Sequence, residues 1–319
     1  MPEARKHEKY EALVRACREL PPVRTAVAHP CDETSLRGAV EAAEAGIIKP
    51  LLIGPEARIR NLAASLNLDI SKLQIVPTPH SHASAAKAVE MVRNGEADAV
   101  MKGSLHTDEL MAEVVDRERG IRTARRISHV FIMDVPTYPK PLFITDAAIN
   151  IFPKLEEKAD IVRNAIDLAH ALSIQLPKIA ILSAVETITS KIPSTIDAAA
   201  LCRMADRGQI TGALLDGPLA LDNAISREAA RIKQIASPVA GDADILLVPD
   251  LEAGNMLAKE LSFLADADAA GIVLGARVPI ILTSRADSVR ARMASCAVAA
   301  LYAHALRMAT TADIGRLAG

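Results

Sequence analysis

A hydroxyl, a guanidinium and a carboxylate stand within four residues of one another at Ser284, Arg285 and Asp287. They follow the apolar run Pro279–Leu282 and precede apolar residues spaced three and four apart, which favours a strand, a turn and then a helix. At such a turn a hydroxyl can donate to an oxygen that gains charge, a guanidinium can clamp a phosphate, and a carboxylate can accept a proton. Simpler alternatives stay open, because Asp287 and Ser288 are favoured helix caps and Arg285 can form a surface salt bridge.

Two further loops carry polar residues directly after apolar runs. They are "MKGSLHTDEL" (101–110) and "LLVPDLEAGNML" (246–257), and each leads into a helical pattern. Their glycines let a ligand approach the backbone, and the free N–H groups of a helix N-terminus attract anions. The candidate ligand-binding residues of these loops are Lys102, Gly103, His106, Thr107, Asp250, Gly254 and Asn255. Thr107 and Asp108 are also ordinary helix caps.

Short apolar runs alternate with longer helical patterns along most of the chain. The predicted strands are Val23–Ala28, Leu51–Ile53, Leu73–Val76, Ala97–Met101, His129–Met133, Leu142–Thr145, Lys178–Leu182, Gly212–Leu215, Ile245–Val248 and Pro279–Leu282. The clearest predicted helices are Ser35–Ala45, Ala83–Arg93, Glu156–Leu172, Glu252–Leu264 and Ser288–Leu306. Several strands are wholly apolar, so we expect right-handed βαβ units and a mainly parallel sheet covered on both faces. In such sheets ligands bind beyond the carboxyl ends of the strands, where the polar loops stand.

The composition argues against several classes of protein. With 319 residues, 50% of them hydrophobic, the chain can form two domains of ~150 residues each. A net charge of −2 and an aromatic content of 2% argue against binding to nucleic acid or to a membrane surface. No apolar run reaches the ~18 residues of a membrane helix, and the charged N-terminal stretch is unlike a signal peptide. Four scattered cysteines without a CxxC pair are typical of a reduced cytoplasmic protein.

Sequence motifs for nucleotides and metals are missing. No GxGxxG follows the first predicted strand and no P-loop signature occurs, which counts against a Rossmann dinucleotide fold and a P-loop NTPase. The "HSH" at 80–82 lacks an accompanying cysteine or carboxylate pattern, so we predict no metal site there. The basic run 116–126, which includes Arg125, is either a phosphate-binding segment or a solvated face.

Five segments together resemble the phosphate acetyl/butyryl transferase family, and they occur in the family's order. They are "MKGSLHTDEL", "ISHVFIM", "LLDGPLALDNA", "SPVAGDADILLVPDLEAGNML" and "LTSRADS", and the resemblance runs from about residue 20 to the C-terminus. It implies the reaction of an acyl-CoA (acetyl- or butyryl-CoA) with phosphate to give an acyl phosphate and CoA, by direct thiolate attack in a ternary complex. Coenzyme A is then a substrate, and neither a tightly bound cofactor nor a metal is implied.

The resemblance also implies an α/β fold of two α/β/α domains with mainly parallel sheets around a cleft, similar to isocitrate/isopropylmalate dehydrogenase. Domain one would be 1–146, completed by 284–319, and domain two would be 147–283. The segment 134–146 holds three prolines, which suit a crossing between domains. A cytoplasmic homodimer or higher homo-oligomer is expected.

By resemblance, Ser284 is the oxyanion or thiol partner and Arg285 is the phosphate clamp. The acetyl-specific branch has its catalytic aspartate seven residues after the serine, where this chain has Ala291, so we assign the base role to Asp287. That branch also has an arginine where this chain has Glu113. Its phosphate-binding role would pass to Lys102, or to Arg122, Arg125 or Arg126.

Two other functions stay open. A metal- and NAD(P)-dependent dehydrogenase of the isocitrate/isopropylmalate or hydroxythreonine-phosphate type needs clustered metal ligands, for which Asp216, Asp222 and Asp250 are available. A CoA-binding protein without catalysis would keep its affinity for CoA but would release no thiol. The acyl chain length cannot be inferred from motifs, because one methylene in an apolar pocket is worth only ~1–3 kcal/mol.

Overall fold

The computed structural model describes residues 8–283 and 288–317. Contacts divide the chain into two compact units: unit 1 contains Arg126–Ala269, and unit 2 contains Tyr10–Arg125 together with the chain from Ala270 onward. Unit 2 is therefore built from two separate stretches of sequence. The predicted division into 1–146 with 284–319, and 147–283, stays a prediction about independently folding domains.

The sheet of unit 2 contains β1 (Val23–Ala28), β2 (Ile48–Gly54), β3 (Gln74–Pro77), β4 (Ala99–Lys102), β10 (Asp268–Leu274) and β11 (Ile280–Ile281). Its strands follow the order β3-β2-β1-β4-β11-β10, and all neighbours are parallel except β10 and β11. Ala28 is in register with Ile53 of β2 and with Lys102 of β4. The carboxyl ends of these strands thus share one edge, and the strand order changes direction between β1 and β4.

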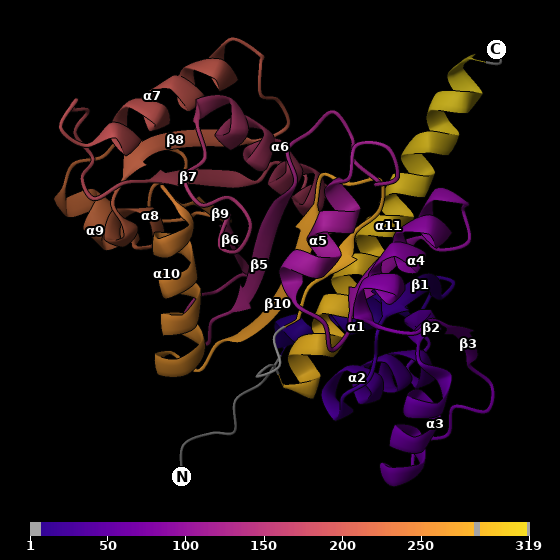
Figure 1. Ribbon diagram of the computed structural model, residues 1–319. Helices are drawn as coiled ribbons and strands as arrows, with labels where there is room; N and C mark the ends of the chain where they lie inside the picture. The colour runs from indigo at the N-terminus through magenta and orange to yellow at the C-terminus, as the bar shows by residue number, and fades with distance from the viewer. Residues whose placement is uncertain (1–7, 284–287, 318–319) are drawn as a thin grey trace, which may run out of the picture. The chain divides into compact units, whose positions relative to one another are not determined.

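Helices cover the sheet of unit 2. The helices α2 (Glu33–Glu44), α4 (Ser81–Arg93) and α11 (Val289–Leu317) contact its strands, and α11, yellow in Figure 1, also contacts α2. Helix α2 begins at Glu33 because the Asp32 carboxylate accepts a hydrogen bond from the Ser35 amide at 2.8 Å. Three more helices are α1 (Glu8–Cys17), α3 (Glu56–Ser65) and α5 (Thr107–Val115).

Unit 1 has a second, mostly parallel set of strands. They are β5 (Ser128–Asp134), β6 (Leu142–Thr145), β7 (Lys178–Leu182), β8 (Leu214–Leu219) and β9 (Ile245–Leu247). Their order is β5-β6-β9-β7-β8, and only β5 and β6 are antiparallel within this set. The helices of this unit are α6 (Leu155–Ala171), α7 (Pro193–Asp206), α8 (Leu221–Ile225), α9 (Arg227–Ile232) and α10 (Leu251–Leu264). Apolar side chains of β5, β6, β7 and β9 pack with α10 into a buried cluster.

The predicted mixed α/β architecture with mostly parallel strands is confirmed. The strands Val23–Ala28, Leu142–Thr145 and Lys178–Leu182 have the predicted bounds. The predicted strand Gly212–Leu215 begins later, at Leu214, because Gly212 has a φ of 85°, in the left-handed region that a strand does not use. Strand β10 has no counterpart among the predicted strands.

Among the described residues, no helix combines the length and the apolar composition that a membrane span requires. All four cysteines are free thiols, and three of them are buried: Cys17, Cys31 and Cys296.

Candidate functional site

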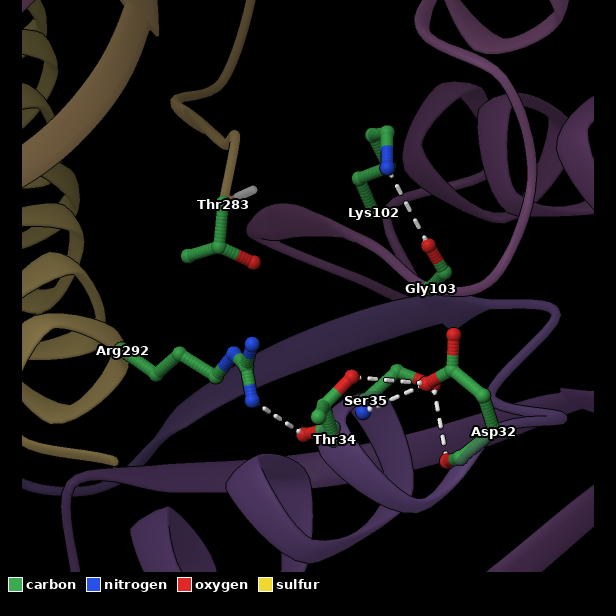
Figure 2. A pocket seen from close by; sticks show the side chains of 7 residues that line it. All are labelled: Asp32, Thr34, Ser35, Lys102, Gly103, Thr283 and Arg292. Atoms are coloured by element: carbon green, nitrogen blue, oxygen red, sulfur yellow. Dashed lines mark hydrogen bonds between the residues drawn. The ribbon is translucent and has the colours of Figure 1, made fainter. Parts of the chain in front are cut away.

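A small open pocket lies at the carboxyl ends of β1, β4 and β11, wholly within unit 2. It has an empty volume of about 200 Å³, part of which is open solvent, and is lined by Asp32, Thr34, Ser35, Lys102, Gly103, Thr283 and Arg292. Figure 2 shows Thr283, Lys102 and Arg292 facing the same space from three elements, with the first turn of α2 beneath them. We call it the unit 2 pocket.

Lys102 and Gly103 line the unit 2 pocket, as the sequence predicts for a ligand-binding loop. Lys102 is the last residue of β4, only 8% exposed, and its Nζ donates to the Gly103 carbonyl at 3.3 Å. The Gly103 amide in turn donates to the Ala28 carbonyl at 2.9 Å, and a Cβ at position 103 would lie 2.3 Å from that oxygen. Only glycine lets the loop after β4 come this close to the end of β1.

Arg292 is a pocket residue that sequence reasoning missed. It lies near the start of α11, is 3% exposed, and donates from Nη1 to the Thr34 carbonyl at 2.9 Å. A Cβ at Gly38 would lie 3.0 Å from its Cδ, so the glycine on α2 makes room for the arginine stem. The signal in the sequence is spacing. Arg292, Cys296 and Ala299 fall on one helical face, so Arg292 lies on the buried face of the helix.

The side chains that line the unit 2 pocket include more positive than negative charges. Lys102 and Arg292 bring two cations, and Asp32 brings one carboxylate, which accepts hydrogen bonds from the Ser35 amide and, at 3.0 Å, from the Thr34 hydroxyl. The N-terminus of α2 adds a partial positive charge. With the hydroxyls of its lining, this arrangement can hold a small anion.

His29 directly follows β1 and lies beside the loop after β4. It is not among the candidate site residues named from the sequence. Its φ is 57°, and its carbonyl accepts from the amides of Cys31 and Ser104, each at 2.8 Å. Its Nδ1 is 3.2 Å from the Ser84 hydroxyl. Burial, and then the charge of Arg58, lowers the pKa of His29, so the ring is neutral at neutral pH. The signal in the sequence is "AHPCDETS" (28–35), a polar loop directly after the first predicted strand.

The proposed catalytic residues Ser284, Arg285 and Asp287 lie outside the described residues. The residue before them, Thr283, lines the unit 2 pocket and is buried. The residue after them, Ser288, accepts a hydrogen bond on its hydroxyl from the Ala291 amide at 3.1 Å. The interpretation of Ser288 as a helix cap is therefore confirmed.

The remaining candidates of unit 2 are not among the residues that line the pocket. His106 is exposed and precedes α5 without a capping hydrogen bond from its side chain. Thr107 is the first residue of α5. Arg125 is exposed, and its amide donates to the Thr123 hydroxyl at 3.1 Å.

Arg126, in unit 1, has partners in that unit. Its Nε donates to the Asn150 side-chain oxygen at 2.7 Å, and its Nη1 is 3.1 Å from a Glu157 carboxylate oxygen. A phosphate-binding role for Arg126 would compete with this ion pair.

Asp250, Gly254 and Asn255 lie at the start of α10 in unit 1. The Asp250 carboxylate caps the helix, accepting from the Ala253 amide at 2.9 Å. A Cβ at Gly254 would lie 2.9 Å from the Asp146 carbonyl oxygen, and the Asn255 side-chain Nδ2 donates to the Ala147 carbonyl at 3.2 Å. These residues fasten α10 to the turn after β6, and their substrate-binding role stays a prediction.

That turn holds a buried polar centre, which sequence reasoning missed. The Asp146 carboxylate accepts from the amides of Ala148 and Ile149, from the His129 amide at 3.2 Å and from the Asn150 side chain at 2.6 Å. The His129 Nδ1 is buried and has no hydrogen-bond partner among the described residues. Burial lowers the pKa of His129, and the nearby Asp146 charge opposes this only in part. The imidazole is therefore neutral at neutral pH.

The aspartates named for the dehydrogenase alternative have separate partners. Asp216 accepts from the Gly217 amide, Asp222 pairs with Lys233 at 3.1 Å, and Asp250 caps α10. Over residues 8–283 and 288–317, no three histidine, cysteine or acidic side chains form a group that could hold a metal ion.

The chain is similar to proteins of one enzyme family over most of its length. The sequence profile described as "Phosphate acetyl/butaryl transferase" matches residues 81–300. A phosphate acetyltransferase from Rhizobium meliloti is 67% identical over 306 residues, which cover 96% of this chain and 97% of that protein. A phosphate butyryltransferase from Clostridium acetobutylicum is 44% identical over 286 residues, covering 90% and 94%.

Solved structures give the same picture of the fold. A branched-chain phosphotransacylase from Enterococcus faecalis has a TM-score of 0.77 at 32% identity, and the match covers 88% of this chain and 99% of that chain. A 4-hydroxythreonine-4-phosphate dehydrogenase from Burkholderia phymatum has a TM-score of 0.54 at 13% identity, covering 88% and 98%. The second likeness concerns the fold alone.

Proposed function

The chain belongs to the phosphate acetyl/butyryl transferase family and is a phosphate acyltransferase, and we propose that it transfers the acyl group between CoA and inorganic phosphate within a ternary complex. In the direction of acyl-CoA synthesis the CoA thiolate attacks the acyl phosphate directly. The observation that carries this proposal is the 67% identity to a phosphate acetyltransferase over nearly the whole of both chains. The unit 2 pocket supports it from geometry, because buried cations, hydroxyls and a helix N-terminus meet at strand ends.

In the direction of acyl-CoA synthesis, the reaction needs a thiolate, because the thiolate rather than the thiol is the nucleophile. A carboxylate takes the thiol proton, the sulfur attacks the acyl carbonyl carbon, and the bond from that carbon to the phosphate oxygen breaks. The phosphate leaves with the electron pair. We assign the proton transfer to Asp287, stabilisation of the carbonyl oxygen to Ser284, and binding of the leaving phosphate to Arg285.

Two observations support this assignment. Thr283, directly before the three residues, lines a pocket suited to an anion. Ser288 already supplies the side-chain oxygen that caps α11, so the helix does not need the Asp287 carboxylate for that purpose.

The first test is release of free CoA, followed with a thiol reagent, in the presence and absence of phosphate. Phosphate-dependent release with converging initial-velocity plots is expected for a ternary complex, whereas parallel plots would indicate a covalent acyl-enzyme. Release without phosphate would contradict the proposed reaction. If no CoA is released at all, a thermal shift with NAD(P) and Mg²⁺ tests the dehydrogenase alternative.

We propose acetyl-CoA as the preferred substrate. The relative named as a phosphate acetyltransferase is 67% identical, against 44% for the one named as a phosphate butyryltransferase. Comparing kcat/KM for acetyl-, propionyl- and butyryl-CoA tests this. A higher kcat/KM for butyryl-CoA would assign the chain to butyryl transfer.

We further infer a homo-oligomer in the cytoplasm and a fold related to isocitrate/isopropylmalate dehydrogenase. The free thiols support a reducing compartment. The likeness to a hydroxythreonine-phosphate dehydrogenase supports the wider fold relationship. Light scattering of the purified protein measures the oligomeric state, and a monomer at micromolar concentration would contradict it.

A further inference from the structure

We propose that His29 is a positioning residue of the enzyme: its carbonyl oxygen holds the loop after β4, residues 103–106, and its ring is tied to Ser84 of α4 so that the carbonyl keeps its orientation. We call residues 103–106 the β4 loop. The inference rests on the proposed function, because this loop contains the candidate substrate-binding residues Gly103 and His106. His29 takes no part in a reaction step itself and acts through the loop.

The carbonyl oxygen of His29 is the first observation. It accepts hydrogen bonds from the amides of Cys31 and Ser104, each at 2.8 Å, and from the Ser104 hydroxyl at 3.1 Å. The Gly103 amide donates to the preceding carbonyl, that of Ala28, at 2.9 Å. The first two amides of the β4 loop are therefore held by two consecutive carbonyl groups at the end of β1, and the position of the loop follows the orientation of these groups.

The backbone of His29 is the second observation. Its φ of 57° lies in the left-handed region, where histidine is more frequent than most residues but still uncommon. Such a conformation persists only where the surrounding structure enforces it. The His29 amide donates to the Ile53 carbonyl at the end of β2 at 2.7 Å, and the ring is held by α4. The unusual backbone is thus fixed through both its main chain and its side chain.

The hydroxyl group that holds the ring is the third observation. Ser84 is fully buried, and its hydroxyl donates to the His80 carbonyl at 3.0 Å. The same oxygen is 2.8 Å from the Thr78 hydroxyl and 3.2 Å from the His29 Nδ1. A hydroxyl has one proton to donate, so the Thr78 hydroxyl and the His29 Nδ1 are both donors to Ser84. The neutral imidazole therefore carries its proton on Nδ1, and Thr78 is in turn held to β2 by a hydrogen bond from its amide to the Gly54 carbonyl at 3.1 Å.

The place of this network in the sheet indicates a role in catalysis. Ala28 is in register with Ile53 of β2 and with Lys102 of β4, so these strand ends lie level at one edge. Ligands of open parallel sheets bind outside the carboxyl ends of the strands. A change at His29 displaces a candidate binding loop at this edge, and a displacement of ~1 Å in a group that positions a substrate can cost about 10²-fold in rate.

The test compares three substitutions of His29 by steady-state kinetics. His29→Asn suits the left-handed backbone and offers an amide N–H to Ser84, His29→Gly suits the backbone alone, and His29→Ala does neither. We expect the asparagine variant to keep kcat within ~3-fold of the wild type, and the other two to lose roughly 10- to 100-fold. KM for phosphate and for acetyl-CoA should change less than kcat, because a misplaced loop loses interactions that form in the transition state.

A substitution on α4 tests the same contact without changing His29. Ser84→Ala removes the acceptor of the Nδ1 proton and should lower kcat at least ~10-fold. The matched control is Ser295→Ala. Ser295 is also fully buried, donates to the Ala291 carbonyl at 2.8 Å and accepts from the Gly271 amide at 3.0 Å. Its loss should lower the free energy of unfolding by a similar amount and change kcat less than ~2-fold.

Hydrogen exchange gives a second readout, which does not depend on catalysis. The amides of Gly103 and Ser104 are bonded to the end of β1, so they should be protected in the wild type. We expect His29→Ala and Ser84→Ala to speed their exchange at least ~10-fold, measured in native buffer, and Ser295→Ala to leave it unchanged.

The outcomes separate this inference from the proposed function. A wild type without phosphate-dependent CoA release would overturn the proposed function, and the role of His29 in the reaction with it. An active wild type whose Ser84→Ala and His29→Gly variants keep a normal kcat would overturn the positioning role alone, whether or not exchange is faster. Equal losses of kcat in His29→Asn and His29→Ala would contradict the hydrogen bond from Nδ1 as the cause. Ser84→Ala and His29→Asn decide the question if His29→Ala does not fold.

Discussion

At the scale of single residues, we expect the neighbours Asp287 and Ser288 to have separable roles. We predict that Asp287→Asn lowers kcat on the order of 10²-fold or more, because Asp287 is the proposed base that activates the thiol. Ser288→Ala should instead lower the free energy of unfolding by about 1 kcal/mol while kcat changes little, because its hydroxyl caps α11. Kinetics and denaturant titration of both variants test the pair. Near-normal turnover of Asp287→Asn would remove Asp287 from the mechanism.

Gly103 is the residue at which the backbone has least room. We predict that Gly103→Ala lowers the free energy of unfolding by about 1–3 kcal/mol and raises KM for phosphate, because the nearest atoms to a new Cβ are the backbone oxygens of Ala28 and His29. Backbone cannot move aside as a flexible side chain can, so the Lys102 loop must shift. Urea titration and phosphate kinetics measure the two effects, and an unchanged pair of values would show that the loop tolerates the methyl group.

At the scale of elements, Asp250 illustrates how a cap and a binding residue are told apart. Asp250→Ala should lower the free energy of unfolding by about 1 kcal/mol through loss of the α10 cap, and Asp250→Ser should keep most of it. A role in substrate binding predicts, in addition, a rise in KM for acetyl-CoA in both variants. Equal stability of Asp250→Ala and wild type would contradict the capping role.

The sequence predicts most strands because burial on both faces makes them apolar without interruption. Strand β10 escapes prediction because its residues "DAAGIVL" begin with an acid and contain small residues of low strand propensity. Its strand conformation depends on antiparallel pairing with β11, where Ile272 lies opposite Ile281, and such a contact is not visible in local sequence.

The unit 2 pocket could be predicted only in part. Lys102 and Gly103 stand out because they follow an apolar run, and the same logic applies to the Asp32 loop. Arg292 is different, because an arginine in a helix is usually exposed to solvent. Its neighbours in the pocket are also far away in sequence: Thr34 lies 258 residues earlier. Proximity across such distances is set by strand order, which sequence patterns do not specify.

At the scale of the whole molecule, buried neutral histidines make stability depend on pH. Burial lowers the pKa of His29 and His129, so the unfolded chain binds more protons than the folded one below about pH 6.5. The free energy of unfolding associated with the neutral rings is fully present above pH 6.5. It decreases as the pH falls from there toward the pKa values that the two histidines have in the folded protein. We predict that His129→Gln flattens the decrease in unfolding free energy between pH 6.5 and about pH 5. Identical slopes in the wild type and the variant would contradict the prediction.

A second acid-sensitive group lies in unit 1. Although burial alone would raise the pKa of Asp242, hydrogen bonds from Lys178 and Lys140 lower it to about 2. A carboxyl group whose pKa is lowered by folding stabilises the fold above the pKa of 3.8 that it has in the unfolded chain. This stabilisation is lost as the pH falls from about 4 to 2. Asp242→Asn should therefore cost about 2 kcal/mol of unfolding free energy at pH 7 and nothing near pH 2. A cost that does not vary with pH would point to packing instead.

The interruption of unit 2 by unit 1 has a consequence for synthesis of the protein. Strand β4 is complete long before β11 is translated, and at ~5–20 residues per second the delay is roughly 10 to 35 s. Throughout that interval the nascent chain displays an apolar strand edge without its partner, and such an edge can pair with another chain. Newly made enzyme should consequently depend on chaperones until the last part of unit 2 is translated, and Arg292 reaches Thr34 only at that final step.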